Sequence, residues 1–402
     1  MSRVAISVGL TLLVVAAMAS QGGDLSPQSR VNLAFALEPS YDEALARLGH
    51  RWPPLYPSLL WAGARVGMPP DTTNLLLFLA TLAALVPAAR WAAPAIAPVF
   101  PVVLYAVCAF NYWNLHQLVS EALLVPLALG VLLLAERCHR DDPARAGYAR
   151  NIASLTALAA AACLTRYFAI FWLLPLAAWV AAGPPGSRRL VRAGSVLAIA
   201  AAPVGLWMAH ARSITGHLTG MDRFAPRSYE TLTTFTANLE LAARSLAMDW
   251  FGTSGPASHA ALRGSWQPSM LDAGLLGLAS AVVVACGIAG FRAARAGTAS
   301  PPARRADSLL LVCFSVGHVG WVVLLWTIGN NDPIYSRFLY PSYVFFLLAG
   351  FHAYSNLKPS SHSHAQGAWL RAPFLALFAL VLAVQALATL GMIWPAIAGT
   401  GG

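Results

Sequence analysis

Long apolar runs separated by short polar connections dominate this chain of 402 residues. A helix needs about 20 mainly apolar residues to cross a bilayer, and runs close to this length predict about eleven spanning helices. The predicted spans are residues 4–20, 73–89, 93–110, 118–136, 150–164, 167–182, 190–209, 272–290, 308–328, 337–355 and 371–395. The pattern therefore predicts an all-α, polytopic membrane helix bundle that forms a single domain over residues 1–402.

The first apolar run follows Arg3 and ends at Ala17-Met18-Ala19, which resembles a signal-peptide cleavage site. The favoured interpretation is an uncleaved first helix, and a removed signal peptide is the alternative. In either case the residues that follow are expected to begin on the outer side of the membrane.

One further apolar stretch, Pro53–Met68, could cross the membrane or lie along its surface. Arginine and lysine accumulate in cytoplasmic loops. If this stretch does not cross and the N-terminus is inside, every strongly basic connection falls inside. These connections lie at Arg90 and within residues 137–150, 188–192, 292–305 and 358–371. If the stretch crosses, the agreement inverts for each later loop, so the charges predict a juxtamembrane segment within a first outer loop of residues 21–70.

Composition supports a membrane protein and removes several other classes. The chain is 58% hydrophobic and 10% charged, whereas a soluble domain has about 25% charged residues. Its net charge of +10 could suggest a nucleic-acid partner, but the basic residues lie in short inner loops, so no such partner is expected. The five cysteines form no CxxC or Cys/His pattern, so neither a structural disulfide nor a zinc site is expected.

The remaining polar residues gather in the predicted outer segments, which include residues 21–70, 111–117, the large outer loop 210–270, and 329–337. Asp24 follows the first run and is either a general base or an N-cap. Glu121 begins an apolar run, where the helix dipole favours an acid. Its alternative role is to orient a substrate hydroxyl or a basic partner.

Two arginines, Arg166 and Arg337, also fall on the outer side by this charge count. Each precedes an aromatic residue and could be an interfacial anchor. Each could instead bind a phosphate through its guanidinium group. Further candidate binding residues on this side are Arg212, His50, Tyr56 and Tyr340. No metal-binding spacing links the histidines, so no metal site is predicted.

Four stretches, in this order and on this face, resemble the GT-C superfamily of polyprenyl-phosphate-sugar-dependent glycosyltransferases. They are Asp24 followed by RWPPLYPSLL, then LHQLVSEALLVPL, then Leu164-Thr165-Arg166-Tyr167, and finally Arg337-Phe338-Leu339-Tyr340-Pro341. The similarity is greatest to bacterial members of the protein-mannosyltransferase and aminoarabinose-transferase type. It extends over residues 1 to about 355.

The resemblance implies a GT-C fold with juxtamembrane helices in the first outer loop, and an inverting transfer of sugar from a polyprenyl-phosphate donor. A first-loop carboxylate would deprotonate the hydroxyl of an extracytoplasmic lipid, glycan or protein acceptor. The site would face the exterior of a bacterial inner membrane. No cofactor is required by this mechanism, although a divalent metal could sit between loop acids.

This chain departs from the family pattern after Asp24, because Leu25 and Ser26 stand where members often have a second acid or glycine. Asp42 and Glu43 are therefore rivals of Asp24 as the base, with Asp24 preferred for its place beside the first run. A second hypothesis is a transporter or flippase of lipid-linked sugars, whose polar residues should line a path through the membrane. A third is a scaffold, in which the polar residues should not converge.

Overall fold

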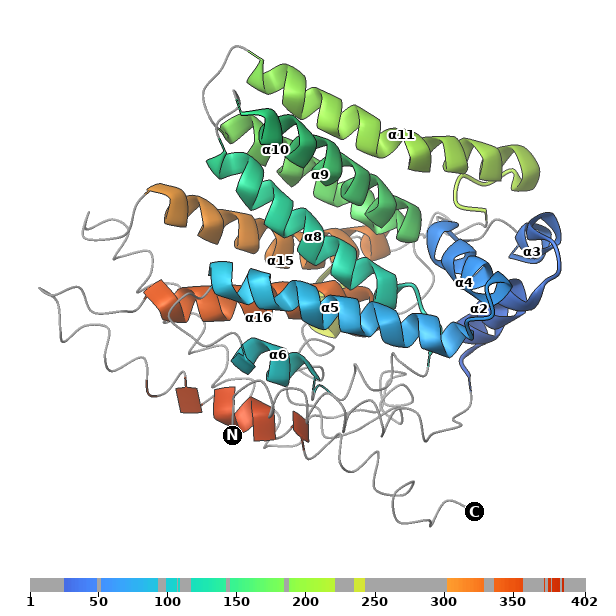
Figure 1. The fold of residues 1–402 in the computed structure, drawn as a ribbon, viewed down its shortest axis with the longest axis horizontal. Helices are drawn as coiled ribbons and strands as arrows, with labels where there is room; N and C mark the ends of the chain where they lie inside the picture. Colours follow the sequence, from blue (N-terminus) through green and yellow to red (C-terminus); the bar gives the residue numbers. More distant parts are fainter. Residues whose placement is uncertain are drawn as a thin grey trace, which may run out of the picture.

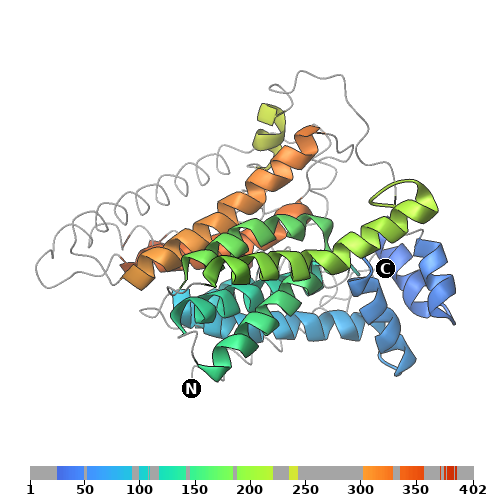
Figure 2. The same cartoon turned by 90° about the horizontal axis from the view of Figure 1, so that it is seen from above.

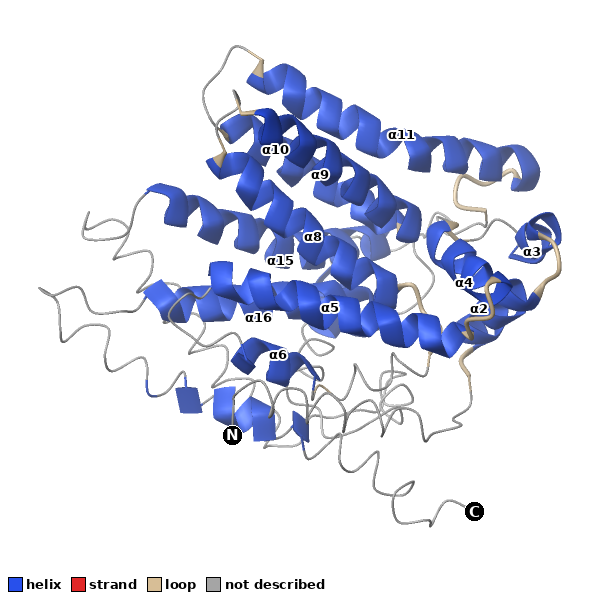
Figure 3. Cartoon of the chain, in the orientation of Figure 1, coloured by secondary structure: helices blue, strands red, loops and turns tan. Residues whose placement is uncertain are grey.

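The structure is a computed structural model that describes part of the chain. The described residues are 25–48, 52–92, 99–106, 108, 117–141, 145–183, 188–220, 235–242, 302–328 and 336–356, together with parts of 372–386. Within these ranges all regular structure is helical and no strand occurs (Figure 3). The predicted spans 4–20 and 272–290 lie outside the described residues, so the number of crossings stays a prediction.

Three short helices cluster at one end of the bundle: α2 (Pro27–Leu37), α3 (Tyr41–Leu48) and α4 (Leu55–Arg65) (Figure 1). Ser26 caps α2 by accepting a hydrogen bond from the Ser29 amide, with proline at the first position of the helix. The 11 residues of α4 span about 17 Å, which is too short for a hydrocarbon core of about 30 Å. The stretch Pro53–Met68 therefore does not form a spanning helix, as its charge context predicts.

Longer helices make up the body of the bundle. Among the described residues, three helices are long and apolar enough to cross a membrane: α5 (Pro70–Ala92), α8 (Glu121–Arg140) and α11 (Arg189–Thr215). The others are α6 (Val99–Ala106), α9 (Ala146–Thr165), η1 (Tyr167–Trp172), α10 (Leu173–Ala182), α15 (Pro302–Ile328) and α16 (Ser336–Asn356). Most of these helices agree with predicted spans to within a few residues. Helices α11 and α15 each extend six residues beyond the predicted spans 190–209 and 308–328, and the span 167–182 begins as the 3₁₀ helix η1. Of the predicted span 93–110, the structure describes a helix only over α6.

Helices α8, α9, α10 and α11 run alternately in opposite directions, so the C-terminus of one lies beside the N-terminus of the next (Figures 1 and 2). The C-terminus of α8 carries Arg137 and Arg140, and the N-terminus of α11 carries Arg189 and Arg192. These termini lie together at the end of the bundle away from α2–α4, which we call the basic end (Figure 1). The grouping of arginines predicted from the loops is therefore present in the fold.

Helix α8 lies at the centre of the bundle and packs against α5, α9, α10 and α16. Its Leu124, Leu129 and Leu132 are fully buried in the main hydrophobic cluster. Gly130 of α8 lies against α9, where a Cβ atom would be 2.7 Å from Cδ1 of Leu158, so the Leu158 side chain would have to shift. Small residues allow this kind of close packing between membrane helices.

We expect Gly130→Val to lower the stability of the bundle by about 1–3 kcal/mol, because the added methyl groups would force the Leu158 side chain out of its present position between α8 and α9. The measurement is the thermal unfolding temperature of the purified protein in detergent. Gly205→Val is the matched control, since Gly205 lies in α11 and a Cβ atom there would meet no heavy atom within 4 Å. Equal effects of the two substitutions would contradict the proposed α8–α9 contact.

Candidate functional site

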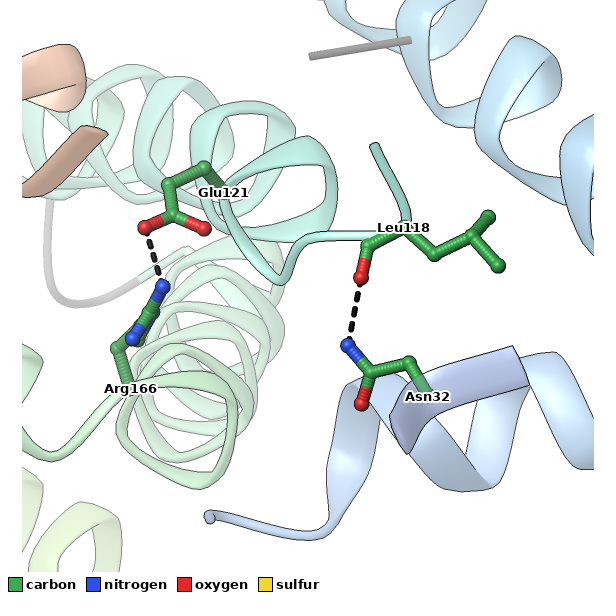
Figure 4. Close-up of polar contacts among 4 residues, drawn as sticks. All are labelled: Asn32, Leu118, Glu121 and Arg166. Carbon is green, nitrogen blue, oxygen red and sulfur yellow. Dashed lines mark hydrogen bonds and ion pairs between the residues drawn. The ribbon is translucent and has the colours of Figure 1, made fainter. Parts of the chain in front are cut away.

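A buried ion pair joins the first residue of α8 to the residue that ends α9. Arg166 donates through Nη2 to Oε1 of Glu121 (Figure 4). Glu121 is 0% exposed and Arg166 is 4% exposed. Burying a lone charge is costly, so each side chain here compensates the charge of the other. The structure thus brings together two of the predicted site residues, which are 45 positions apart in the sequence.

The backbone around Arg166 explains how its side chain is aimed. Arg166 leaves α9 in an extended conformation, with φ −148° and ψ 129°. Its amide still donates to the Ala162 carbonyl at 3.0 Å, and its carbonyl accepts from the Ala169 amide at 3.0 Å in the following η1. The residue is therefore held from both sides at a break between two helices, where an unpaired helix end would otherwise leave backbone groups unsatisfied.

Glu121 has further capacity to accept hydrogen bonds. Its Oε2 atom is buried and accepts none from any residue that the structure describes. A carboxylate has about four lone-pair positions, so this oxygen can accept from a donor such as a hydroxyl. The ion pair is therefore a fixed polar group, and one of its carboxylate oxygens has no donor among the described residues.

A hydrogen-bond network fastens α2 to the segment that leads into α8. Oε1 of Gln117 accepts from the Ser26 amide and from the Ser29 hydroxyl, each at 2.8 Å. Nδ2 of Asn32 donates to the Leu118 carbonyl at 2.5 Å (Figure 4). These contacts set the start of the first loop beside the residues that immediately precede Glu121.

Helices α4 and α5 join the same network through Tyr56 and Asn74. The Tyr56 hydroxyl donates to Oδ1 of Asn74 at 2.8 Å, and Nδ2 of Asn74 donates to the Gln117 carbonyl at 3.0 Å. Tyr56 is 0% exposed. Burial, and then the nearby charge of Glu121, raise the pKa of Tyr56 well above 10.0. The phenol therefore stays protonated and acts as a donor within the network.

Gln117, Asn32 and Asn74 were missed by sequence reasoning, although all three are buried polar residues. The available signal was an amide side chain within or beside an apolar run, since such groups are retained only where they find partners. Gln117 ends a predicted outer segment, and Asn74 lies near the start of a predicted span.

Other predicted residues lie apart from this network. Asp42 and Glu43 are exposed in the first turn of α3, and Arg212 is exposed in the last turn of α11. Asp24 and His50 lie outside the described residues, as do the side chains of Arg337 and Tyr340, whose backbone forms the first turns of α16. Their predicted roles therefore stay predictions.

Within the described ranges, no three histidine, cysteine, aspartate or glutamate side chains come together in a way that could hold a metal ion. Of the polar side chains inside the bundle, His318 accepts from Nε1 of Trp172 at 3.1 Å. It packs against the rings of Phe168 and Trp172. This histidine is part of an aromatic cluster within the bundle, between η1 and α15.

Comparison with known proteins shows the fold. No protein-family model matches the sequence, and no curated protein matches it either. Among solved structures, the chain is similar to the crystal structure of ArnT from Cupriavidus metallidurans bound to undecaprenyl phosphate. The TM-score is 0.54 at 13% identity, over 98% of this chain and 75% of ArnT. The predicted polytopic membrane helix bundle is therefore confirmed, and the chain shares its fold with this ArnT structure.

We expect Arg166→Ala to lower stability by about 3–5 kcal/mol, because it leaves the Glu121 carboxylate buried without its counter-charge. The double substitution Glu121→Leu with Arg166→Met should recover most of this loss, since it removes both charges. Thermal unfolding in detergent measures both effects.

Arg140→Ala is the matched control for the ion pair. Arg140 pairs with Glu136 at 2.5 Å, but its side chain is 48% exposed. Glu136 is 11% exposed, but water can still reach the half-exposed guanidinium, so this pair should contribute about 1 kcal/mol, less than a fully buried one. A loss for Arg166→Ala no larger than that for Arg140→Ala would contradict the structural role of the buried pair.

The raised pKa of Tyr56 predicts how alkaline pH affects stability. The folded state holds the phenolic proton more tightly than the unfolded state, whose pKa is near 10.0. Above that pH the unfolded chain binds fewer protons, so the free energy of unfolding falls as pH rises. Tyr56→Phe cannot titrate, so its stability should fall less steeply than that of the wild type between about pH 10 and 11.5. Parallel pH profiles of unfolding temperature would refute this assignment.

Proposed function

We propose that this chain, which has the GT-C fold, is an integral membrane glycosyltransferase that transfers a sugar from a polyprenyl-phosphate donor. The observation that carries the proposal is the buried Glu121–Arg166 pair at the α2–α4 end of the bundle. The structural neighbour ArnT was crystallised with undecaprenyl phosphate, which supports a donor of this lipid class. A bacterial inner membrane, with the α2–α4 end facing outward, agrees with the distribution of arginines.

In this mechanism the leaving group is the lipid phosphate, which gains negative charge as the glycosidic bond breaks. A guanidinium group fixed nearby stabilises that charge without having to reorganise. Arg166 is already oriented by Glu121 and by its own backbone hydrogen bonds. Arg337, at the start of α16, is a second candidate for the phosphate.

The acceptor hydroxyl must lose a proton as it attacks the anomeric carbon, and a single displacement of this kind inverts the configuration. We assign the base to Asp24. It precedes Ser26, whose amide is bonded to Gln117 at 2.8 Å, four positions before Glu121. The rivals Asp42 and Glu43 lie exposed on α3. The Gln117 network thus supports Asp24 over the α3 pair.

The available Oε2 of Glu121 gives the ion pair a second task in this proposal. It can accept a hydrogen bond from a donor or acceptor hydroxyl and so orient the substrate beside Arg166. The fixed positions of α2 and α4 would then confine the reacting groups.

We expect Asp24→Asn to lower sugar transfer by about 10²–10⁴-fold, the range that a general base contributes. Membranes containing the protein would be incubated with labelled polyprenyl-phosphate sugars, and labelled product would be measured at matched protein amounts. Asp42→Asn is the control and should keep activity close to that of the wild type.

If Asp24→Asn kept full activity and Asp42→Asn lost it, the general base would be on α3 and not at Asp24. The transporter hypothesis gives a different outcome with the same reagents. In that case no donor yields a covalent product, but labelled lipid changes leaflet in vesicles that contain the protein.

A further inference from the structure

An open groove of about 860 Å³ runs between α9 and α11. On its α9 side the lining consists mainly of alanine, at positions 149, 153, 157 and 160. On its α11 side, Val191, Ile199 and Pro203 complete a largely apolar surface. Its volume lies within the range of about 300–1,000 Å³ that is usual for ligand sites.

The length of the groove corresponds to one leaflet of a membrane. Along α9 it extends from Tyr148 to Ala160, which is about 18 Å at 1.5 Å per residue. Half of a hydrocarbon core is about 15 Å thick. A single extended acyl chain therefore matches the groove in both length and polarity.

Two arginines stand at one end of this apolar surface, Arg188 and Arg192. The guanidinium carbon of Arg192 lies 5.2 Å from the centre of the Tyr148 ring, a contact that fixes the side chain over the groove. Its buried Nε atom has no hydrogen-bond partner among the described residues. The polar end of the groove is thus positively charged.

Acidic residues of the described chain do not neutralise this end. Neither Arg188 nor Arg192 forms an ion pair with a described carboxylate. Asp141, which follows α8, instead accepts a hydrogen bond from Nδ2 of Asn151 at 2.7 Å. The two guanidinium groups therefore lack an anionic partner among the described residues, and a bound anion would supply one.

The groove is separate from the Glu121–Arg166 pair. Tyr148 and Arg166 are at opposite ends of α9, about 27 Å apart along the helix. That distance is close to the full thickness of a bilayer core, about 30 Å. The groove therefore opens toward the leaflet at the basic end of the bundle, away from the proposed site of sugar transfer.

We propose that the α9–α11 groove binds an anionic phospholipid from the leaflet at the basic end. Its phosphate pairs with Arg188 and Arg192, and one acyl chain lies along Ala153 and Ala157. The arginines supply selectivity for charge, and the alanine surface provides contact with the chain. This assignment is independent of the transfer activity, because none of its residues belongs to the Glu121–Arg166 network.

The test uses the full-length protein, delipidated in detergent and titrated with lipids of identical acyl chains. Native mass spectrometry would count bound phosphatidylglycerol and phosphatidylcholine, and inorganic phosphate would be added as a competitor. We expect phosphatidylglycerol to bind more tightly. We also expect each of Arg188→Ala and Arg192→Ala to weaken it about five-fold, as for an arginine at an anionic membrane surface.

Arg189→Ala is the matched control for charge, since Arg189 is exposed, adjacent in sequence and not part of the groove lining. It should leave binding unchanged. Ala153→Leu should weaken both lipids by occupying the groove. Ala198→Leu, an exposed position on α11 outside the lining, should weaken neither.

Several outcomes would overturn the proposal. Equal losses for Arg189→Ala and Arg192→Ala would indicate attraction to a basic surface in general. Equal affinity for the two lipids would remove the role of the arginines. Competition by inorganic phosphate with no effect of Ala153→Leu would indicate a free-phosphate site without an acyl chain. If Arg192→Ala does not fold, Arg188→Ala gives the same comparison, because Arg188 is exposed.

Discussion

The burial of two opposite charges sets the geometry of the α2–α4 end of this bundle. Glu121 has no exposed surface and Arg166 has 4%, so neither charge can rely on water and each must face the other. To satisfy this constraint α9 has to end at Arg166 with extended backbone, and α8 has to begin at Glu121. The residues just before Glu121 are then placed where Gln117 and the Leu118 carbonyl can bind α2. Tyr56 and Asn74 add α4 and α5 to the same arrangement.

A polar cluster of this kind is suited to chemistry at a membrane surface. Its donors and acceptors are already oriented by the fold, which is the condition under which electrostatic stabilisation of a leaving phosphate is most effective. Between Glu121 and Glu136 the sequence of α8 holds no charged residue, and the same is true of α9 between Arg150 and Arg166. The charges of these two helices are therefore concentrated near their ends, whereas a transport path would be expected to place them along the helices.

The opposite end of α9 uses the same residue types in a different setting. Arg192 stacks on Tyr148 and borders an open, alanine-lined groove, whereas Arg166 is enclosed and paired with Glu121. An enclosed guanidinium requires a protein counter-charge, but one at the rim of a groove can take its partner from the membrane. Helix α9 thus has the Glu121–Arg166 ion pair at one end and the proposed lipid-binding groove at the other.

Local features of the sequence determined the helical membrane architecture, because the length of an apolar run and the charge of its flanking loops are readable without knowledge of packing. The same reasoning predicted that Pro53–Met68 does not cross, and it selected Glu121 and Arg166 as candidates one by one. Only the tertiary structure decided that these two meet across 45 positions, or that Gln117 binds Ser29 across 88. Helix periodicity repeats every few residues and holds no information about which faces of distant helices pack together. The partners of Tyr56 and the α9–α11 groove had to come from the fold for that reason.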